Sequence, residues 1–340
     1  MKSMNSGMII PLLMVLLAGC IVLSLGIGRY PVHPADVAGI ILSTPPGAVI
    51  DNTDTKSIIV EIVRMPRILL VVFSGAGLAM AGAAMQGVFR NPLVGPEVVG
   101  VSSGASFGGV LGILFGWSTP VVVLTAFGFG MAALVLAFLL AGASGRSGIL
   151  GLVLAGVIMG SFFGALMGIL QYVADPASKL PGMIFWLMGS FASADYEKVG
   201  ILAAVTLTAG TLLLGLRWRI NLLSLGEEDA AALGINVSLI RWVIVALVSV
   251  IVAAQVSVSG GVGWVGLVIP HIARMMVGPD HTKLLPASAL LGGIYLLLMD
   301  DMARALTPQE IPIGLLTSVI GTPVFAFLFW KMQGKGWSND

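Results

Sequence analysis

The amino-acid sequence predicts an all-α polytopic membrane protein with about ten transmembrane helices and both termini in the cytoplasm. Of the 340 residues, 57% are hydrophobic and 10% are charged, whereas a water-soluble domain carries about 25% charged residues. The apolar residues form continuous runs of about 20, the length that an α-helix needs to cross a bilayer. A transmembrane barrel would show shorter segments of alternating hydrophobicity. The chain from residue 1 to residue 340 is therefore predicted to be a single transmembrane domain.

The predicted spans are residues 8–27, 65–89, 98–115, 120–140, 150–173, 199–216, 241–258, 262–277, 284–299 and 313–330. The first contains Leu17-Ala18-Gly19-Cys20, which resembles the end of a lipoprotein signal peptide. A cleaved signal has an apolar core of about 7–15 residues, and this run continues to residue 27, so an uncleaved helix is predicted. Residues 29–61 are predicted to be a polar connection. Residues 180–191 are too few to span and indicate an interfacial or re-entrant helix.

The second span is predicted to lie inside the helix bundle. Between residues 68 and 88 its only strongly polar side chain is Gln86. Small residues let neighbouring helices approach closely, and this span has five of them: Gly75, Ala76, Ala79, Gly82 and Ala83.

The fifth span carries a glycine at every fourth position, which puts the glycines on one helix face: Gly156, Gly160, Gly164 and Gly168. Such a stripe predicts close helix packing. A surface that lines a substrate path is the alternative.

The distribution of Lys and Arg gives the orientation. An even number of spans puts both termini on one side, and that side holds 10 of the 17 Lys and Arg residues, which makes it cytoplasmic. Three of the seven outer cations, Arg64, Arg67 and Arg304, flank helix ends. They indicate a function on the outer face, with ordinary snorkelling anchors as the alternative.

The connection at residues 217–240 is predicted to carry a short cytoplasmic helix. Glu227, Glu228 and Asp229 would occupy its first turn, where the helix dipole favours acids, and Gly234 is suited to a left-handed cap. A helix this short is unstable alone, so the segment is interpreted as a knob that docks into a soluble partner, with a solvated loop as the alternative. The segment comprises Gly226, Glu227, Glu228, Asp229, Ala230, Ala231, Ala232, Leu233 and Gly234.

Several motifs argue against an enzyme or a cofactor site in this chain. Gly261, Gly263 and Gly266 match a dinucleotide-binding pattern, but the motif opens a membrane helix and no strand precedes it. The chain has no G-x-x-x-x-G-K-[ST] sequence for ATP. His271 stands alone, whereas metal sites need clustered ligands, so a structural role is favoured. The single cysteine, Cys20, excludes an internal disulfide. No basic cluster indicates nucleic acid binding.

Intramembrane acids would mark an ion-coupled carrier. Glu97, Asp300 and Asp301 lie near span ends, and the central parts of the spans are almost free of ionisable groups. This pattern favours an energy source outside the chain. An ion-coupled secondary carrier of a large solute is the alternative, and a membrane enzyme ranks last because no reactive side chains cluster.

Four stretches together resemble one family: RMPRILLVVFSGAGLAMAGAAMQGVFRNPLVGPEVVGVSSGA, LSLGEEDAAALG, GGVGWVGLVIPHIARMMVGPDHTKLLP, and DDMAR followed by EIPIGLLTSVIGTPVF. They are similar to the FecCD-type permeases, the membrane subunits of bacterial ABC importers for iron siderophores, haem and cobalamin. The resemblance covers about residues 60 to 330. It implies a multi-pass protein of the bacterial cytoplasmic (inner) membrane, and these motifs do not distinguish between the three kinds of cargo.

The resemblance also implies partners and roles. Two copies of the chain would pair in the membrane lipid, two cytoplasmic ATPase subunits would bind ATP and Mg and dock on residues 226–234, and an extracytoplasmic binding protein would deliver substrate. Arg64, Arg67 and Arg304 would dock that binding protein, by pairing with its carboxylates. The cytoplasmic gate would include Asn91, Pro92 and Leu93. The sequence departs from the family pattern at residues 147–150, which are less polar than expected, and at Asp301, which adds a second acid beside Asp300.

Overall fold

Every regular element in the described residues is a helix. The computed structural model describes residues 6–28, 30–43, 54–143 and 148–333. Ser147, one of the residues at which the sequence departs from the family pattern, lies outside these ranges. The helices are α1 Ser6–Gly26, α2 Pro34–Ser43, α3 Thr55–Ser57, the π-helix η1 Ile58–Arg64, α4 Met65–Phe89, the 3-10 helix η2 Pro96–Val99, α5 Val101–Phe115, α6 Thr119–Ala143, α7 Ile149–Val173, α8 Leu180–Leu187, α9 Tyr196–Gly215, α10 Arg217–Leu225, α11 Glu227–Ala232, α12 Val237–Ser259, α13 Val265–Val277, α14 His281–Ala305 and α15 Ile313–Gln333. The predicted all-α class is confirmed.

Seven helices in the described residues are long and apolar enough to cross a membrane, and three shorter apolar helices accompany them. The seven contain α1, α4, α6, α7, α9, α12 and α14, and the shorter three are α5, α13 and α15. These ten coincide in order with the ten predicted spans. The number that cross the bilayer and the side of the termini stay predictions.

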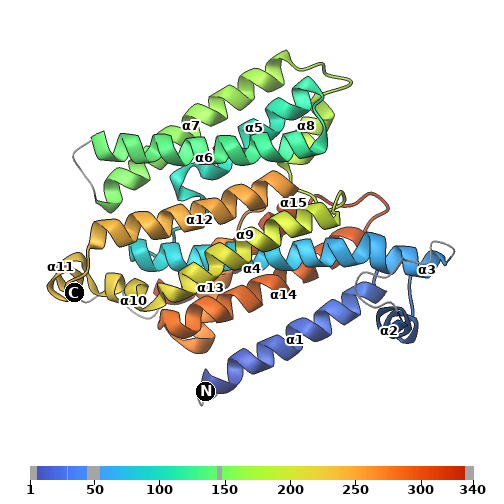
Figure 1. The fold of residues 1–340 in the computed structure, drawn as a ribbon, viewed down its shortest axis with the longest axis horizontal. Helices are drawn as coiled ribbons and strands as arrows, with labels where there is room; N and C mark the ends of the chain where they lie inside the picture. The colour runs from blue at the N-terminus through green and yellow to red at the C-terminus, as the bar shows by residue number, and fades with distance from the viewer. Residues whose placement is uncertain (1–5, 29, 44–53, 144–147, 334–340) are drawn as a thin grey trace.

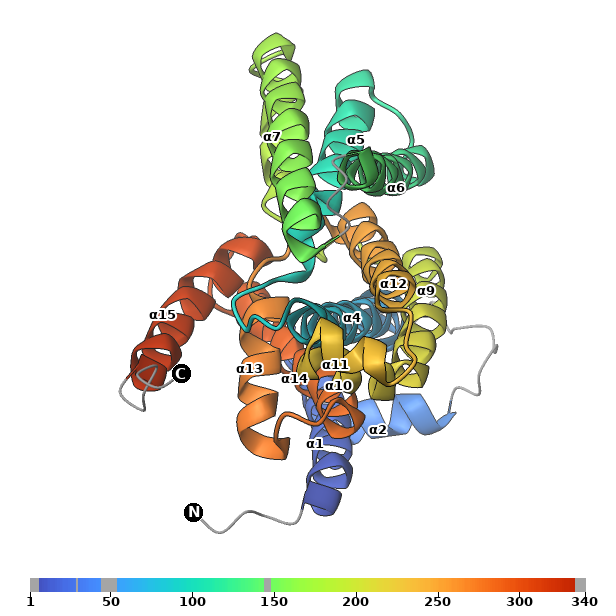
Figure 2. The ribbon, with the colours of Figure 1, turned by 90° about the vertical axis from the view of Figure 1, so that its left-hand side faces the viewer.

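Helix α4 lies at the centre of the bundle, in contact with α14, α13, α12, α9 and α10 (Figures 1 and 2). The contacts are at backbone distance. A Cβ on Gly75 would lie 2.2 Å from the carbonyl oxygen of Gly292 in α14, and one on Gly82 would lie 1.8 Å from that of Gly266 in α13. Gln86 adds a polar link to α13, because its Nε2 donates to the Leu267 carbonyl at 3.2 Å. The predicted interior position is confirmed.

Helices α5, α6 and α7 pack on one another, and α12 joins them to α4 (Figure 2). The α7 glycine stripe is only partly a packing surface. A Cβ on Gly156 would lie 1.9 Å from the Val98 carbonyl oxygen, while Gly164 and Gly168 have nothing within 4 Å of that position. The predicted close packing therefore holds at the Gly156 end, and the other end of the stripe is open in the single chain.

The second span begins earlier than predicted. The helix is continuous from Thr55 to Phe89, over 35 residues, so the predicted polar connection at residues 29–61 contains both α2 and the start of this helix. An ion pair of 2.6 Å between Lys56 and Asp36 ties that start to α2. A polar first turn can extend past the apolar run, since it ends in water.

The ends of α8 and α12 and the start of α15 meet near the glycine motif of residues 261–266. Gly260 adopts φ +72° after α12, where a Cβ would lie 2.0 Å from the Trp186 carbonyl oxygen of α8. The Ile313 amide at the start of α15 donates to the Gly189 carbonyl at 3.0 Å. In this chain the glycines therefore serve close backbone approach at the junction of α8, α12 and α15.

We predict that Gly82→Ala lowers the free energy of unfolding by about 1–3 kcal/mol, because the added methyl must displace the α13 backbone. Gly200→Ala on α9 is the matched control, since nothing lies within 4 Å of its added Cβ. Thermal unfolding of the purified variants in detergent measures both. Equal melting temperatures for the two variants would contradict the central packing of α4.

Candidate functional sites at the two ends of the bundle

At the predicted outer end, Arg67 is buried between two acids. Its Nε and Nη2 donate to Asp300, at 2.9–3.1 Å, and its Nη1 donates to both carboxylate oxygens of Glu310 at 2.9 Å. Arg67 is 7% exposed and Asp300 is 0% exposed. Helix α4 is thereby joined to the end of α14 and to the segment that follows it.

Arg304 and Arg64 extend this cluster to α1. Arg304 pairs with Asp301, and its Nη2 also donates to the Ser24 hydroxyl at 2.6 Å and the Ser24 carbonyl at 2.9 Å. Arg64 donates to the carbonyl oxygens of Leu25, at 2.6 Å, and Tyr30, at 2.5 Å. The cluster is balanced, with three arginines and three acids joining α1, α4 and α14.

The structure corrects the basis on which these arginines were assigned to docking. Arg64, Arg67 and Arg304 are 5%, 7% and 6% exposed, and Arg67 and Arg304 find their carboxylates within this chain. Their docking role stays a prediction. The same pairing explains the second acid: Asp301 serves Arg304 while Asp300 serves Arg67. Glu310 was missed, because nothing local to EIPIG indicates a partner more than 200 residues away.

At the opposite end of the bundle, α11 and its flanking turn lie on the surface. Gly234 adopts φ +82°, which confirms the predicted left-handed cap. Ala230 is fully buried, while Ala231, Ala232 and Leu233 are exposed, Leu233 by 62%. Leu225 just before α11 is also 62% exposed. Apolar side chains exposed on and beside an acidic surface helix are typical of a contact surface for another protein.

Helix α10 fixes this surface to the membrane helices. Asn221 Nδ2 donates to Asp280 at 2.7 Å, and the His281 amide donates to Asn221 Oδ1 at 2.8 Å. The pKa of Asp280 is held below its usual value, first by the Thr282 hydroxyl that donates to it and also by Asn221. A Cβ on Gly87 of α4 would lie 2.5 Å from the His281 ring and 2.6 Å from Ile220 of α10. Sequence reasoning missed Asn221, which has no motif of its own.

The predicted gate segment lies beside α11. Helix α4 ends in a left-handed Arg90 (φ +49°), and the Leu93 amide donates to Asn91 Oδ1 at 2.9 Å. Leu93 is 48% exposed and Pro92 is partly buried. A Cβ on Gly226 would lie 3.7 Å from Arg90 Nη1. The structure thus brings Arg90, the residue before the predicted gate, close to Gly226 at the start of the predicted coupling segment, which is more than 100 residues away in sequence.

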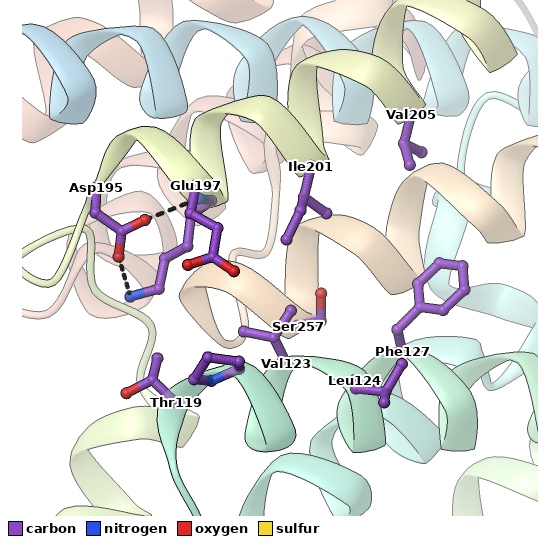
Figure 3. A pocket seen from close by; sticks show the side chains of 11 residues that line it. Thr119, Val123, Leu124, Phe127, Asp195, Glu197, Ile201, Val205 and Ser257 are labelled. Carbon is purple, nitrogen blue, oxygen red and sulfur yellow. Dashed lines mark hydrogen bonds and ion pairs between the residues drawn. The ribbon is translucent and has the colours of Figure 1, made fainter.

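Two cavities lie between the helices. One of about 450 Å³ separates α6 from α9; in Figure 3 Phe127 and Val205 line one end and Asp195 and Glu197 the other. Lys198 at its mouth is bound by Asp195, at 3.6 Å, so the groove is apolar with paired charges at the rim. The second cavity, of about 380 Å³, is lined by Glu97 and by parts of α8, α12 and α15.

The described residues bring no three His, Cys, Asp or Glu side chains together as metal ligands. His271 is buried in α13, 8% exposed. The candidate sites are thus a cluster of buried ion pairs at one end of the bundle and the exposed surface around α11 at the other end. The helix breaks at Gly189 and Gly260 lie between them.

Residues 15–331 match the model of the FecCD transport family. The chain belongs to this family. The molybdate import system permease protein MolB of Haemophilus influenzae is 44% identical over 315 residues, covering 93% of each chain. A probable iron chelatin transport system permease of Helicobacter pylori is 41% identical and covers 84% of this chain and 86% of its own. A solved metal-chelate type ABC transporter in an inward-facing conformation matches with a TM-score of 0.86 and 43% identity, over 96% of this chain and 99% of that one.

We predict that Arg67→Met lowers the free energy of unfolding by about 3–5 kcal/mol, because Asp300 is then left buried without its main partner. Lys56→Met is the matched control: its ion pair with Asp36 is 43% and 41% exposed, so its loss costs about 0–1 kcal/mol. Thermal unfolding in detergent tests both variants. A loss for Arg67→Met no larger than for Lys56→Met would refute the assignment of a buried charge lock.

Proposed function

We propose that this chain is the membrane-spanning permease of an ATP-driven importer in the bacterial cytoplasmic membrane, and that it translocates a metal chelate. The observation that supports this most directly is α11: a short helix that is flanked by the exposed Leu225 and Leu233 and is tied through α10 to α4 and α14. A chain that only conducted a solute would need no such handle. The chain itself is not catalytic, and two cytoplasmic ATPase subunits hydrolyse ATP with Mg.

In this proposal the ATPase subunits dock on residues 226–234 and move α10 with α11. The Asn221–Asp280 hydrogen bond and the contact of Ile220 with Gly87 then carry the movement into α14 and α4. Arg90, which directly precedes Asn91, Pro92 and Leu93, lies beside Gly226, so the same movement would reach the gate.

A second copy of the chain completes the passage. The open end of the α7 stripe, at Gly164 and Gly168, has nothing against it within one chain. Large apolar side chains of the two helices that flank this side are exposed, among them Ile169 (58%) and Val319 (70%). Figure 2 shows α7 and α15 bordering one side of the bundle, which suits a partner of the same sequence.

An extracytoplasmic binding protein delivers the substrate to the outer end. Because Asp300, Asp301 and Glu310 already neutralise Arg67 and Arg304, carboxylates of the binding protein would have to compete with them. Arg64, Arg67 and Arg304 then have two roles: they attract the binding protein by their charge, and they hold α1, α4 and α14 together at the docking face.

The cargo is an iron chelate (a siderophore complex or haem) or cobalamin. The solved metal-chelate type relative and the Helicobacter pylori relative support this class. Molybdate is a second candidate, because the Haemophilus influenzae relative at 44% identity is named for it. Identifying the partner binding protein and measuring its ligand decides between them.

We predict that Ala231→Glu, placed in the exposed face of α11, reduces ATP-coupled uptake by about tenfold or more, since an unpaired carboxylate in a docked interface costs over 1.4 kcal/mol. Ala177→Glu, an exposed alanine just before α8, is the matched control. ATPase co-purification and uptake in proteoliposomes are the measurements. Wild-type coupling in Ala231→Glu would show that the ATPase docks elsewhere.

We further predict that the chain reconstituted alone accumulates no solute against a gradient. When the ATPase, ATP and the binding protein are added, it accumulates solute. An imposed proton or sodium gradient is the control for the rival mechanism. Uphill uptake driven by that gradient, without nucleotide, would establish an ion-coupled secondary carrier instead.

A further inference from the structure

Glu97 differs from Asp300 and Asp301, the two other acids that lie near the ends of predicted spans. Asp300 and Asp301 are held by arginines, whereas Glu97 forms no ion pair within the part of the chain that the structure describes. Its side chain is accessible to solvent although protein surrounds it on most sides. Glu97 is thus a carboxylate that faces a concavity and has no cation beside it.

The concavity is the cavity of about 380 Å³, and Glu97 is the only charged residue that lines it among the described residues. Two of the neutral polar side chains that line the cavity have hydrogen-bond partners: Gln255 donates to Ser259 at 2.8 Å, and Ser318 donates to the Gly314 carbonyl at 2.6 Å. Glu97 therefore sets the charge of the cavity.

The cavity lies at the middle of the bundle. It is lined by Leu78, the fourteenth of the 25 residues of α4. The non-helical residues 261–263 also line it. Non-helical backbone at membrane depth persists only inside protein or against a water-filled space, and a charged side chain at that depth marks a solute path. Both observations point to water in this cavity.

We propose that Glu97 gives the passage a fixed negative charge, so that it favours neutral or positively charged metal chelates and disfavours small oxyanions such as molybdate. The inference rests on the proposed function, since it takes the cavity between α15 and η2 to be part of the passage. It distinguishes between the two cargo candidates by charge. An intramembrane carboxylate without a cation repels an approaching anion most strongly where water is scarce.

The test measures the electrostatic potential of the cavity directly. The full chain, with Cys20→Ser to remove its single cysteine, carries Ser318→Cys in the cavity wall and is reconstituted in proteoliposomes. Rates of modification by a cationic and an anionic methanethiosulfonate reagent are compared with Glu97 and with Glu97→Gln. Ser102→Cys, at another lining position, provides a second reporter should the first variant fail to fold.

We expect the ratio of the cationic to the anionic modification rate to fall about fivefold in Glu97→Gln. The substitution removes one negative charge that attracts the cationic reagent and repels the anionic one inside the cavity. Glu197→Gln is the matched control, because it neutralises an exposed carboxylate in the other cavity and leaves the ratio unchanged. An unchanged ratio in Glu97→Gln overturns the charge assignment. Thiols that react at neither position overturn the placement of the cavity in the passage. Failure of the proposed function would be seen separately, as absence of ATP-dependent uptake by the wild-type assembly.

Discussion

The close approach of α13 and α14 to α4 is the constraint on which the rest of the structure depends. Helices in lipid gain no hydrophobic energy from meeting one another, so their association relies on close van der Waals contact and polar links. Gly75 against Gly292 and Gly82 against Gly266 bring the backbones together, and Gln86 closes the seam with hydrogen bonds to α13 and to Arg274. Because α4 also carries Arg67 near its start and Gly87 near its end, its position sets both functional ends.

The outer end shows how charge can be tolerated beside the membrane. A buried arginine left alone would be costly, and the desolvation of each ion offsets much of the attraction between partners. Here three cations and three acids balance, and the ion pairs of Arg67 and Arg304 are supplemented by hydrogen bonds from or to Ser24 and the backbone. Such a network contributes little net stability but fixes the register of α1, α4 and α14. It also pairs Asp300 and Asp301, two of the three acids near span ends that an ion-coupled carrier could use, with arginines.

Much of the fold could be predicted from the sequence, because helix length and small-residue content are local properties. The predicted end of the second span, residue 89, is the end of α4, and Gly234 adopts the predicted cap conformation. The failures are non-local. Nothing near Arg67 indicates that its partners lie 233 and 243 residues away, so the sequence predicts a docking cation or a snorkelling anchor there and not a buried ion pair. The α7 stripe was interpreted as one surface, although only its Gly156 end meets a neighbour within the chain.

The charge cluster at one end of α4 and the contact with α10 at the other end have a joint mechanical consequence. Helix α4 has 25 residues, about 37 Å of rigid rod at 1.5 Å per residue. Its outer end is bound to α14 through Arg67, and its other end abuts α10 at Gly87. A push on α10 therefore cannot slide α4 past α14 without breaking buried ion pairs, and the two helices must tilt together about the outer cluster. Between these ends, at the helix breaks of Gly189 and Gly260, backbone hydrogen bonds join the segment after α8 to the end of α12 and to the start of α15. That junction borders the Glu97 cavity, so the tilt is absorbed where the solute would pass.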